Sequence, residues 1–417
     1  MVCMWGELMK SIGPARILIL FILIAPLAPS AHGQKTVAMR STPPTRRQAA
    51  RVLPSLKLTK LDGIHFPIPA PMAISDWTAC DAAGNVYLLY SPFVKYSGSG
   101  PMPVPDVMDR PVIKLGVQSQ DTTQYTARPE GLPDGYLPAA YSVDNLGDVF
   151  RLFLQGNGAL PSRGPEVVKY DHDGGIDSIT RLRLPHRDEI MPANFFAFSN
   201  GNLLLTGILY PRPVRRSPLA SPRKNRAHLH IPPSFRPFTG IFDNDGALIA
   251  ELRLPQDVIP NKNNDTPVAP SSGPDRRRYW PMEMVGTLFA HGPDDTAYLL
   301  RPRWPAVLYT ISDNGRVLRR ATLRGTGVNH LHPNLIGAAG ASLVFVNYIG
   351  VSTTLRHTIK SVNRLVIFNS VSGKAIESYD PPTAGGYFLA CAANARNFTY
   401  LGSSKHGNLE IFDYTKN

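Results

Sequence analysis

Hydrophobic residues in this chain gather in short runs that follow small polar turns containing Gly or Asn. This first repeat pattern occurs six times, as DAAGNVYLLY (81–90), DNLGDVFRLFL (144–154), FSNGNLLLTGIL (198–209), GPDDTAYLL (292–300), GAAGASLVFVNY (337–348) and ANARNFTYLG (393–402). In YLLY, LLL and LVFV both faces of the predicted strand are apolar, which is typical of strands sandwiched between neighbouring sheets. The pattern therefore predicts β-strands that are buried on both sides.

A second repeat pattern alternates with the first and predicts hairpins. It consists of an apolar strand, a turn that ends in Gly and an alternating strand, and it occurs as VVKYDHDGGIDSITRLRLP (167–185), TGIFDNDGALIAELRLP (239–255), VLYTISDNGRVLRRATLRG (307–325) and RLVIFNSVSGKAIESYDP (364–381). Asp-Gly and Asn-Gly between apolar runs are strong hairpin signals, because both tolerate positive φ. The alternation in RLRLP and ELRLP indicates edge strands with one face in water.

Together the two patterns predict an all-β fold, a β-propeller in which small four-stranded sheets, the blades, stack around a ring. No run of ten or more residues shows the helical period of about 3.6 residues. We predict six blades, at 70–130, 136–186, 190–255, 281–325, 328–381, and 386–416 together with 54–62. A seventh blade hidden within 205–282 is the alternative.

The two ends of the predicted propeller complete each other. The last segment, GNLEIFDYTKN (407–417), supplies the third strand of a blade and lacks a fourth, whereas SLKLTKLDG (55–63) resembles an outer strand with nothing before it. We therefore predict that Leu56–Leu61 pairs beside Glu410–Tyr414, so that an N-terminal strand completes the C-terminal blade. Closure of this kind removes the exposed strand edge that an open sheet presents.

On these repeats and this closure, residues 55–416 resemble the six-bladed propellers of the NHL and gluconolactonase-like group in architecture. Such propellers serve as binding platforms, lactonases, lyases and signalling modules, so the fold alone does not select a function. The resemblance implies a ligand site where the innermost strands open at one face. For a lactonase-like member it also implies one divalent, calcium-like cation, for which Asp76, Asn194 and Glu283 are the candidate ligands.

The innermost strand of each blade is expected just before each first repeat pattern, where it lines the central channel. The channel candidates at those places are Asp76, Trp77, Tyr141, Ser142, Asn194, Glu283, His330, His332 and Tyr387. His330 and His332 share one strand face, and they are interpreted either as a zinc or acid–base pair or as an ordinary channel pair. DHDGG (171–175) and DNDGA (243–247) resemble calcium loops but lack the remaining ligands, so we interpret them as hairpin turns.

The N-terminal segment has the pattern of a secretory signal. Lys10 and Arg16 precede the apolar run 17–25, and small residues end the segment, so we expect 1–33 to be a signal peptide that is removed. The protein would then be secreted or periplasmic, and an uncleaved membrane anchor is the alternative. Residues 34–53 are expected to be a disordered basic leader, followed by the propeller over 54–417.

Beyond residue 33 the chain has two cysteines, Cys80 and Cys391, at matching places in TACDAAGN and LACAANAR. A disulfide between them is conceivable in an oxidising compartment. Equivalent positions on adjacent inner strands are, however, expected to exceed the Cα separation of about 4.4–6.8 Å that a disulfide needs. We therefore expect two buried thiols.

The chain is basic, with a formal net charge of +13 at pH 7. Two predicted insertions, 211–237 and 256–280, carry the candidates for a basic rim, which are Arg215, Arg216, Arg223, Arg276, Arg277 and Arg278. Because the strands of a blade alternate in direction, both insertions are expected on the same face. Guanidinium groups there would suit carboxylate, sulfate or phosphate, and two solvated loops are the alternative.

The sequence contains no G-x-S-x-G, H-E-x-x-H, G-x-x-x-x-G-K or C-x-x-C. The serine-hydrolase elbow, zincin, P-loop and dithiol classes are therefore not indicated. We expect an exported, monomeric binding scaffold without a cofactor, whose ligand is an anionic glycan or a protein of the envelope or the medium rather than nucleic acid. A metal-assisted hydrolase, lactonase-like and with its site at the channel mouth, is the alternative.

Overall fold

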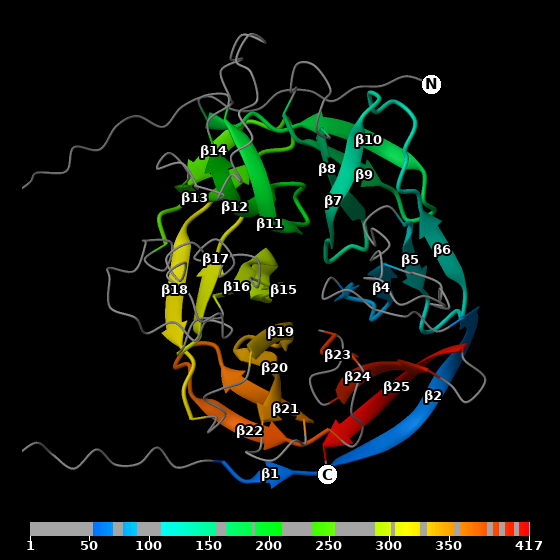
Figure 1. Cartoon of the computed structure of the whole chain (residues 1–417), viewed down its shortest axis with the longest axis vertical. Helices are drawn as coiled ribbons and strands as arrows, with labels where there is room; N and C mark the ends of the chain where they lie inside the picture. The colour runs from blue at the N-terminus through cyan, green and yellow to red at the C-terminus, as the bar shows by residue number, and fades with distance from the viewer. Residues whose placement is uncertain are drawn as a thin grey trace, which may run out of the picture. The chain divides into compact units, whose positions relative to one another are not determined.

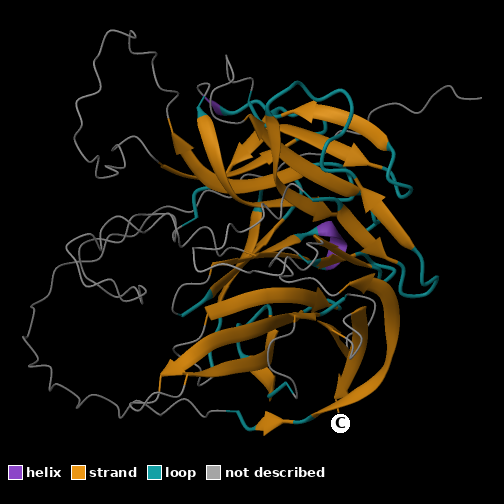
Figure 2. Cartoon of the chain, turned by 45° about the vertical axis from the view of Figure 1, so that its right-hand side comes forward, coloured by secondary structure: helices purple, strands orange, loops and turns teal. Residues whose placement is uncertain are grey.

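The computed structural model describes residues 53–69, 78–89, 110–155, 164–185, 188–210, 236–254, 288–301, 305–325, 332–353, 359–381, 387–391, 397–403 and 408–416. Strands and turns predominate in this part of the chain, with a short 3-10 helix at Pro293–Asp295 (Figure 2). No helix found there has the length and hydrophobicity needed to cross a membrane. The predicted signal peptide 1–33 and residues 34–52 of the predicted leader lie outside the described residues.

The strands form six sheets that follow one another around a ring (Figure 1). From the innermost strand outward, the blades are β3 (Ala79–Cys80), β4 (Val86–Leu89), β5 (Val112–Leu115), β6 (Thr122–Tyr125); β7 (Tyr136–Val143), β8 (Val149–Gln155), β9 (Glu166–Tyr170), β10 (Ile176–Arg181); β11 (Glu189–Ala197), β12 (Leu203–Tyr210), β13 (Arg236–Phe242), β14 (Leu248–Glu251); β15 (Leu288–His291), β16 (Ala297–Arg301), β17 (Val307–Ile311), β18 (Val317–Thr322); β19 (His332–Ala339), β20 (Leu343–Thr353), β21 (Ile359–Asn369), β22 (Ala375–Tyr379); and β23 (Tyr387–Leu389), β24 (Asn397–Ser403), β25 (Asn408–Lys416), β2 (Leu58–Pro69).

This arrangement confirms the predicted six-bladed β-propeller, and the described residues contain no seventh sheet. The core is divided into six apolar clusters, and each cluster lies between two successive blades. The strands that the first repeat pattern predicted to be apolar on both faces, such as β4 and β16, are buried along their whole length. Each blade therefore depends on its neighbouring blades to bury its apolar side chains.

The D-x-D-G segments form hairpin turns, as predicted. Asp171 Oδ1 accepts hydrogen bonds from the backbone N–H groups of Asp173 and Gly175, at 3.0 and 2.8 Å. Gly174 has a φ of 89°, in the left-handed region that favours glycine. The carboxylate thus satisfies backbone donors within the turn.

The predicted closure is confirmed, with one correction. β2 pairs antiparallel with β25, in a register that places Lys60 opposite Tyr414 and His65 opposite Glu410. Leu56, however, belongs to β1 (Ser55–Leu56), which pairs in parallel with the outer strand β22 of the fifth blade. The N-terminal segment therefore pairs with two blades. β1 pairs with the outer edge of β22, where backbone groups would otherwise be unpaired, and β2, which follows it in the chain, pairs with β25.

The expectation of two free thiols is wrong. Cys80 and Cys391 form a disulfide whose Cα atoms are 5.4 Å apart, and it joins the first blade to the sixth. Cys80 ends β3, and Cys391 follows shortly after the end of β23 at Leu389, so the disulfide joins the inner edges of the two blades. Their separation is within the range that a disulfide requires.

Replacing both cysteines by serine, in a chain that begins at residue 34, is expected to lower the free energy of unfolding by about 2–5 kcal/mol. The reason is that the disulfide closes a loop with a sequence separation of 311 residues. Urea unfolding of the two proteins measures the difference. Adding a reductant should destabilise the parent protein by a similar amount and leave the serine variant unchanged; an unaffected parent would contradict the disulfide.

Asp144 caps the turn between β7 and β8 from a buried position. Its Oδ1 accepts hydrogen bonds from the backbone N–H groups of Leu146 and Asp148, each at 2.9 Å, and the residue is 1% exposed. Burial raises the pKa of Asp144 from its ordinary value of 3.8 to about 6, with a further contribution from the Asp148 carboxylate and opposition from the backbone hydrogen bonds. The folded protein therefore holds this proton more tightly than the unfolded chain.

The stabilising contribution of the Asp144 proton is complete below about pH 4 and is lost as the pH rises through about 6. Asp144→Asn keeps an acceptor oxygen in the turn and removes the buried charge. Its stability relative to the parent should increase between pH 4 and pH 8, by roughly 2 kcal/mol. Urea unfolding at both pH values tests this, with the exposed Asp173→Asn as the control that should change little; an equal effect of both variants at all pH values would refute it.

Candidate functional site

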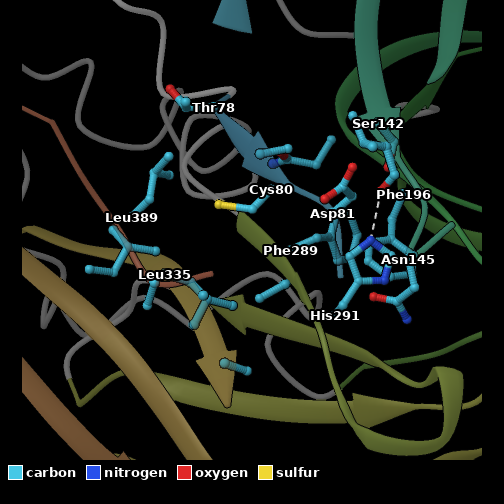
Figure 3. Close-up of a pocket in the computed structure, with 18 of the residues that line it drawn as sticks. Thr78, Cys80, Asp81, Ser142, Asn145, Phe196, Phe289, His291, Leu335 and Leu389 are labelled. Atoms are coloured by element: carbon cyan, nitrogen blue, oxygen red, sulfur yellow. Dashed lines mark hydrogen bonds between the residues drawn. The ribbon is translucent and has the colours of Figure 1, made fainter. Parts of the chain in front are cut away.

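The innermost strands of all six blades line a central cavity of about 110 Å³. β3, β7, β11, β15, β19 and β23, or the turns beside them, contribute its lining. Figure 3 shows the two sides of the cavity: Leu335 and Leu389 lie on one side, and Ser142, Asn145 and His291 lie on the other. The cavity is therefore apolar toward the fifth and sixth blades and polar toward the second and fourth.

Asn194 is a channel candidate that lines this cavity. A β-bulge in β11, where the register shifts between Pro192 and Asn194, sets its position in the strand. Its side chain is buried, and Nδ2 has no hydrogen-bond partner among the described residues. A buried amide without a partner is costly, so a polar group that reached Nδ2 would be favoured there.

His291 is a site residue that the sequence analysis did not single out. Its Nε2 donates a hydrogen bond to the Val143 carbonyl, at 2.7 Å, and its ring centroid lies 4.4 Å from that of Phe196. His291 of the fourth blade thus contacts the second blade, and Phe196 of the third blade packs against its ring. Burial lowers the pKa of His291 below its ordinary value, although the hydrogen bond to Val143 and the charge of Asp295 oppose this.

The neutral His291 ring therefore carries its hydrogen on Nε2, because a carbonyl only accepts hydrogen bonds. Nδ1 then keeps a lone pair. A sequence signal for this residue existed: His291 comes immediately before the turn of its blade, as Cys80 and Val143 do in theirs. Comparing these equivalent positions would have identified the histidine as an inner-strand residue.

Two other cavity residues hold neighbouring blades together. The Tyr141 hydroxyl donates to the Tyr87 carbonyl at 3.1 Å, and burial raises the pKa of Tyr141. Ser142 Oγ accepts a hydrogen bond from the backbone N–H of Ala197, at 3.0 Å. Tyr141 therefore lies beside the cavity, as predicted from the repeats, but its polar atom belongs to the contact between the first and second blades.

Asp81 brings a carboxylate to the edge of the cavity, but both of its oxygens are occupied. Oδ1 accepts from the backbone N–H of Asn85, and Oδ2 accepts from Asn85 Nδ2 and the Tyr87 hydroxyl, at 2.7 and 2.9 Å. The described lining of the cavity therefore holds one carboxylate, the neutral His291 ring and no Lys or Arg side chain.

Most other candidates cannot be placed in the site. Asp76, Trp77, Glu283 and His330 lie outside the described residues, as does the whole basic-rim set Arg215, Arg216, Arg223, Arg276, Arg277 and Arg278. His332 begins β19 and Tyr387 begins β23, so the backbone of both belongs to inner strands as expected. The cation site formed by Asp76, Asn194 and Glu283 stays a prediction; in the described part of the chain, no group of three or more His, Cys, Asp or Glu side chains is suited to a metal ion.

The strand order of the third blade locates the attachment points of both basic insertions. β12 ends at Tyr210 before the first insertion, and β14 ends at Glu251 before the second. β12 and β14 each pair antiparallel with β13, so both strands end at the same end of the sheet. The turns that follow β7, β11 and β15 lie at the opposite end of their strands.

No protein-family model matches the chain, and the search of curated proteins gave no match. Among solved structures, a protein of unknown function from Dyadobacter fermentans matches 86% of this chain and 99% of its own at 10% identity, with a TM-score of 0.47. A gluconolactonase from Xanthomonas campestris matches 85% and 98% at 12% identity, with a TM-score of 0.39. A luciferin-regenerating enzyme matches 86% and 95% at 8% identity, with a TM-score of 0.38.

These likenesses concern the fold. The six-bladed architecture rests on the strand order of this chain itself. At such identities and TM-scores, no activity is transferred to this chain.

Proposed function

We propose that this protein is an exported six-bladed propeller that acts as a binding scaffold for an anionic glycan or protein of the envelope or the medium. The observation that carries the binding part of the proposal is the shared attachment of insertions 211–237 and 256–280 at one end of the third blade. Both insertions are rich in arginine. Positive charge concentrated at one end of a ring attracts and orients an anionic ligand.

Export is supported by two independent features. The first is the signal-like segment 1–33. The second is the Cys80–Cys391 disulfide, since structural disulfides persist in oxidising compartments and are rare in the cytosol. Neither feature depends on the identity of the ligand.

Reversing four charges, with Arg215, Arg216, Arg276 and Arg277 each changed to Glu, is expected to weaken binding to an immobilised sulfated polysaccharide by roughly 10-fold or more at low salt. The reason is that both insertions are proposed to contact the same anionic ligand. The measurement is the affinity for heparin as a function of salt, which should show a shallower salt dependence for the variant.

A matched control variant carries the same change of net charge on the outer strands or just beyond them. Arg183, Arg253, Arg319 and Arg320 are exposed there, and their change to Glu should reduce heparin binding much less. Equal losses in the two variants would show that overall charge, and not the two insertions, determines binding.

Expressed with its complete N-terminus in a host that secretes proteins, the chain is expected to begin at about residue 34 after processing. Intact-mass measurement determines this start, and thiol titration without reductant should find no free thiol. A secreted or membrane-bound product that retains residues 1–33 would favour the anchor alternative, and a reduced cytosolic product would contradict export.

A further inference from the structure

The central cavity has a chemical character that the proposed function does not use. Its polar side lies near the ends of the inner strands, before the turns, whereas the basic insertions attach at the opposite end of the third blade. Binding in this cavity would therefore be independent of the proposed function.

The groups on the polar side have unused hydrogen-bonding capacity. Asn194 Nδ2 is buried without a partner among the described residues, and so is His291 Nδ1. Asn145 lines the same cavity at intermediate exposure through the turn after β7. Its backbone carbonyl accepts from Ala82 N–H, and no hydrogen bond of its side-chain amide occurs within the described part of the structure. The described lining thus holds unpaired donors and an unpaired acceptor; Asn194 Nδ2 and His291 Nδ1 have almost no accessible surface, whereas Asn145 is partly exposed.

The described lining residues from the fifth and sixth blades include no polar side chain. Leu335, Ile336, Ala338, Leu389 and Ala390 line this side of the cavity. Water bound there has few partners, since a buried water normally makes about three hydrogen bonds. An apolar group that displaces water from this side is therefore favoured.

We propose that the cavity binds a small, uncharged, amphipathic molecule that carries a single hydroxyl or amide group. The hydroxyl or amide would hydrogen-bond to Asn145 and, after a small shift of its side chain, to Asn194, and the apolar part would pack against Leu335 and Leu389. An anionic group is disfavoured, because the described lining holds the Asp81 carboxylate, the neutral His291 ring and no Lys or Arg side chain. A cationic group would have to compete with the three hydrogen bonds that Asp81 already accepts.

The volume of about 110 Å³ limits the ligand to a few heavy atoms inside the cavity. Cavities of about 150 Å³ take up molecules of the size of benzene, and typical sites for drug-sized ligands are larger, at about 300–1,000 Å³. Asn145 is partly exposed, so the polar side has a contact with solvent there. A ring with one hydroxyl group therefore approaches the upper limit of size.

Phenol, toluene and benzoate test the proposal, because they are similar in size and differ in the polar group. Calorimetry or ligand-observed NMR on the disulfide-bonded protein should show phenol binding with a Kd on the order of 1 mM, toluene binding at least about threefold more weakly, and no benzoate binding. If no phenol binding is detected at a phenol concentration of about 20 times this expected Kd, the proposal is overturned, and the cavity holds water only.

Asn145→Ala should weaken phenol binding by about 3- to 10-fold and leave toluene binding unchanged. Asn194→Ala is the second variant and should also weaken phenol binding. It breaks no hydrogen bond of Nδ2 within the described residues, because that atom has no partner there. Asn244→Ala, at an exposed turn of the third blade outside the cavity lining, is the matched control and should have no effect. Equal effects on phenol and toluene, or an effect of the control, would overturn the assignment. Heparin binding should be unaffected by all three variants, so this proposal and the proposed function fail separately.

Discussion

The structure depends on the closure of a ring in which no blade can bury its apolar surface alone. Each of the six apolar clusters takes its side chains from two successive blades, so every blade needs both neighbours. The contact between the sixth and first blades is the one that the order of the chain does not supply. It receives the pairing of β2 with β25 and the Cys80–Cys391 disulfide. Polar contacts reinforce other interfaces, among them Tyr141 to Tyr87, Ala197 to Ser142, Tyr298 to Ser370 and Ala390 to Ile336.

The features that the sequence predicted well are those that depend on local pattern. The apolar runs became strands buried on both sides, and the Asp-Gly turns became hairpins, because strand burial and turn chemistry are encoded within a few residues. The pairing of β2 with β25 was also predictable, since an unmatched first strand and an incomplete last blade leave few alternatives. The details that failed depend on distant partners: Leu56 pairs with β22, and the approach of Cys80 to Cys391 depends on how closely the inner strands converge.

The same distinction explains what could be predicted about the cavity. The repeat register identified Tyr141 and Asn194 as inner-strand residues, and both line the cavity. It did not reveal that the Tyr141 hydroxyl is used between two blades while Asn194 Nδ2 has no partner, because that outcome depends on side chains of neighbouring sheets. His291 was missed because its role arises from a contact with Val143, two blades away across the channel.

The contrast between the periphery and the centre of the ring follows from the cost of removing charge from water. Arginine side chains in long connections can stay solvated, and they attract an anionic ligand without losing their hydration. In the cavity an unpaired charge would be desolvated by surrounding side chains, which is unfavourable unless a partner is present. Asp81 has such partners in Asn85 and Tyr87, and His291 avoids the cost by remaining neutral. The two proposals therefore assign different ligands to separate places: an anionic ligand to the arginine-rich insertions and an uncharged molecule to the cavity, whose described lining has no Lys or Arg.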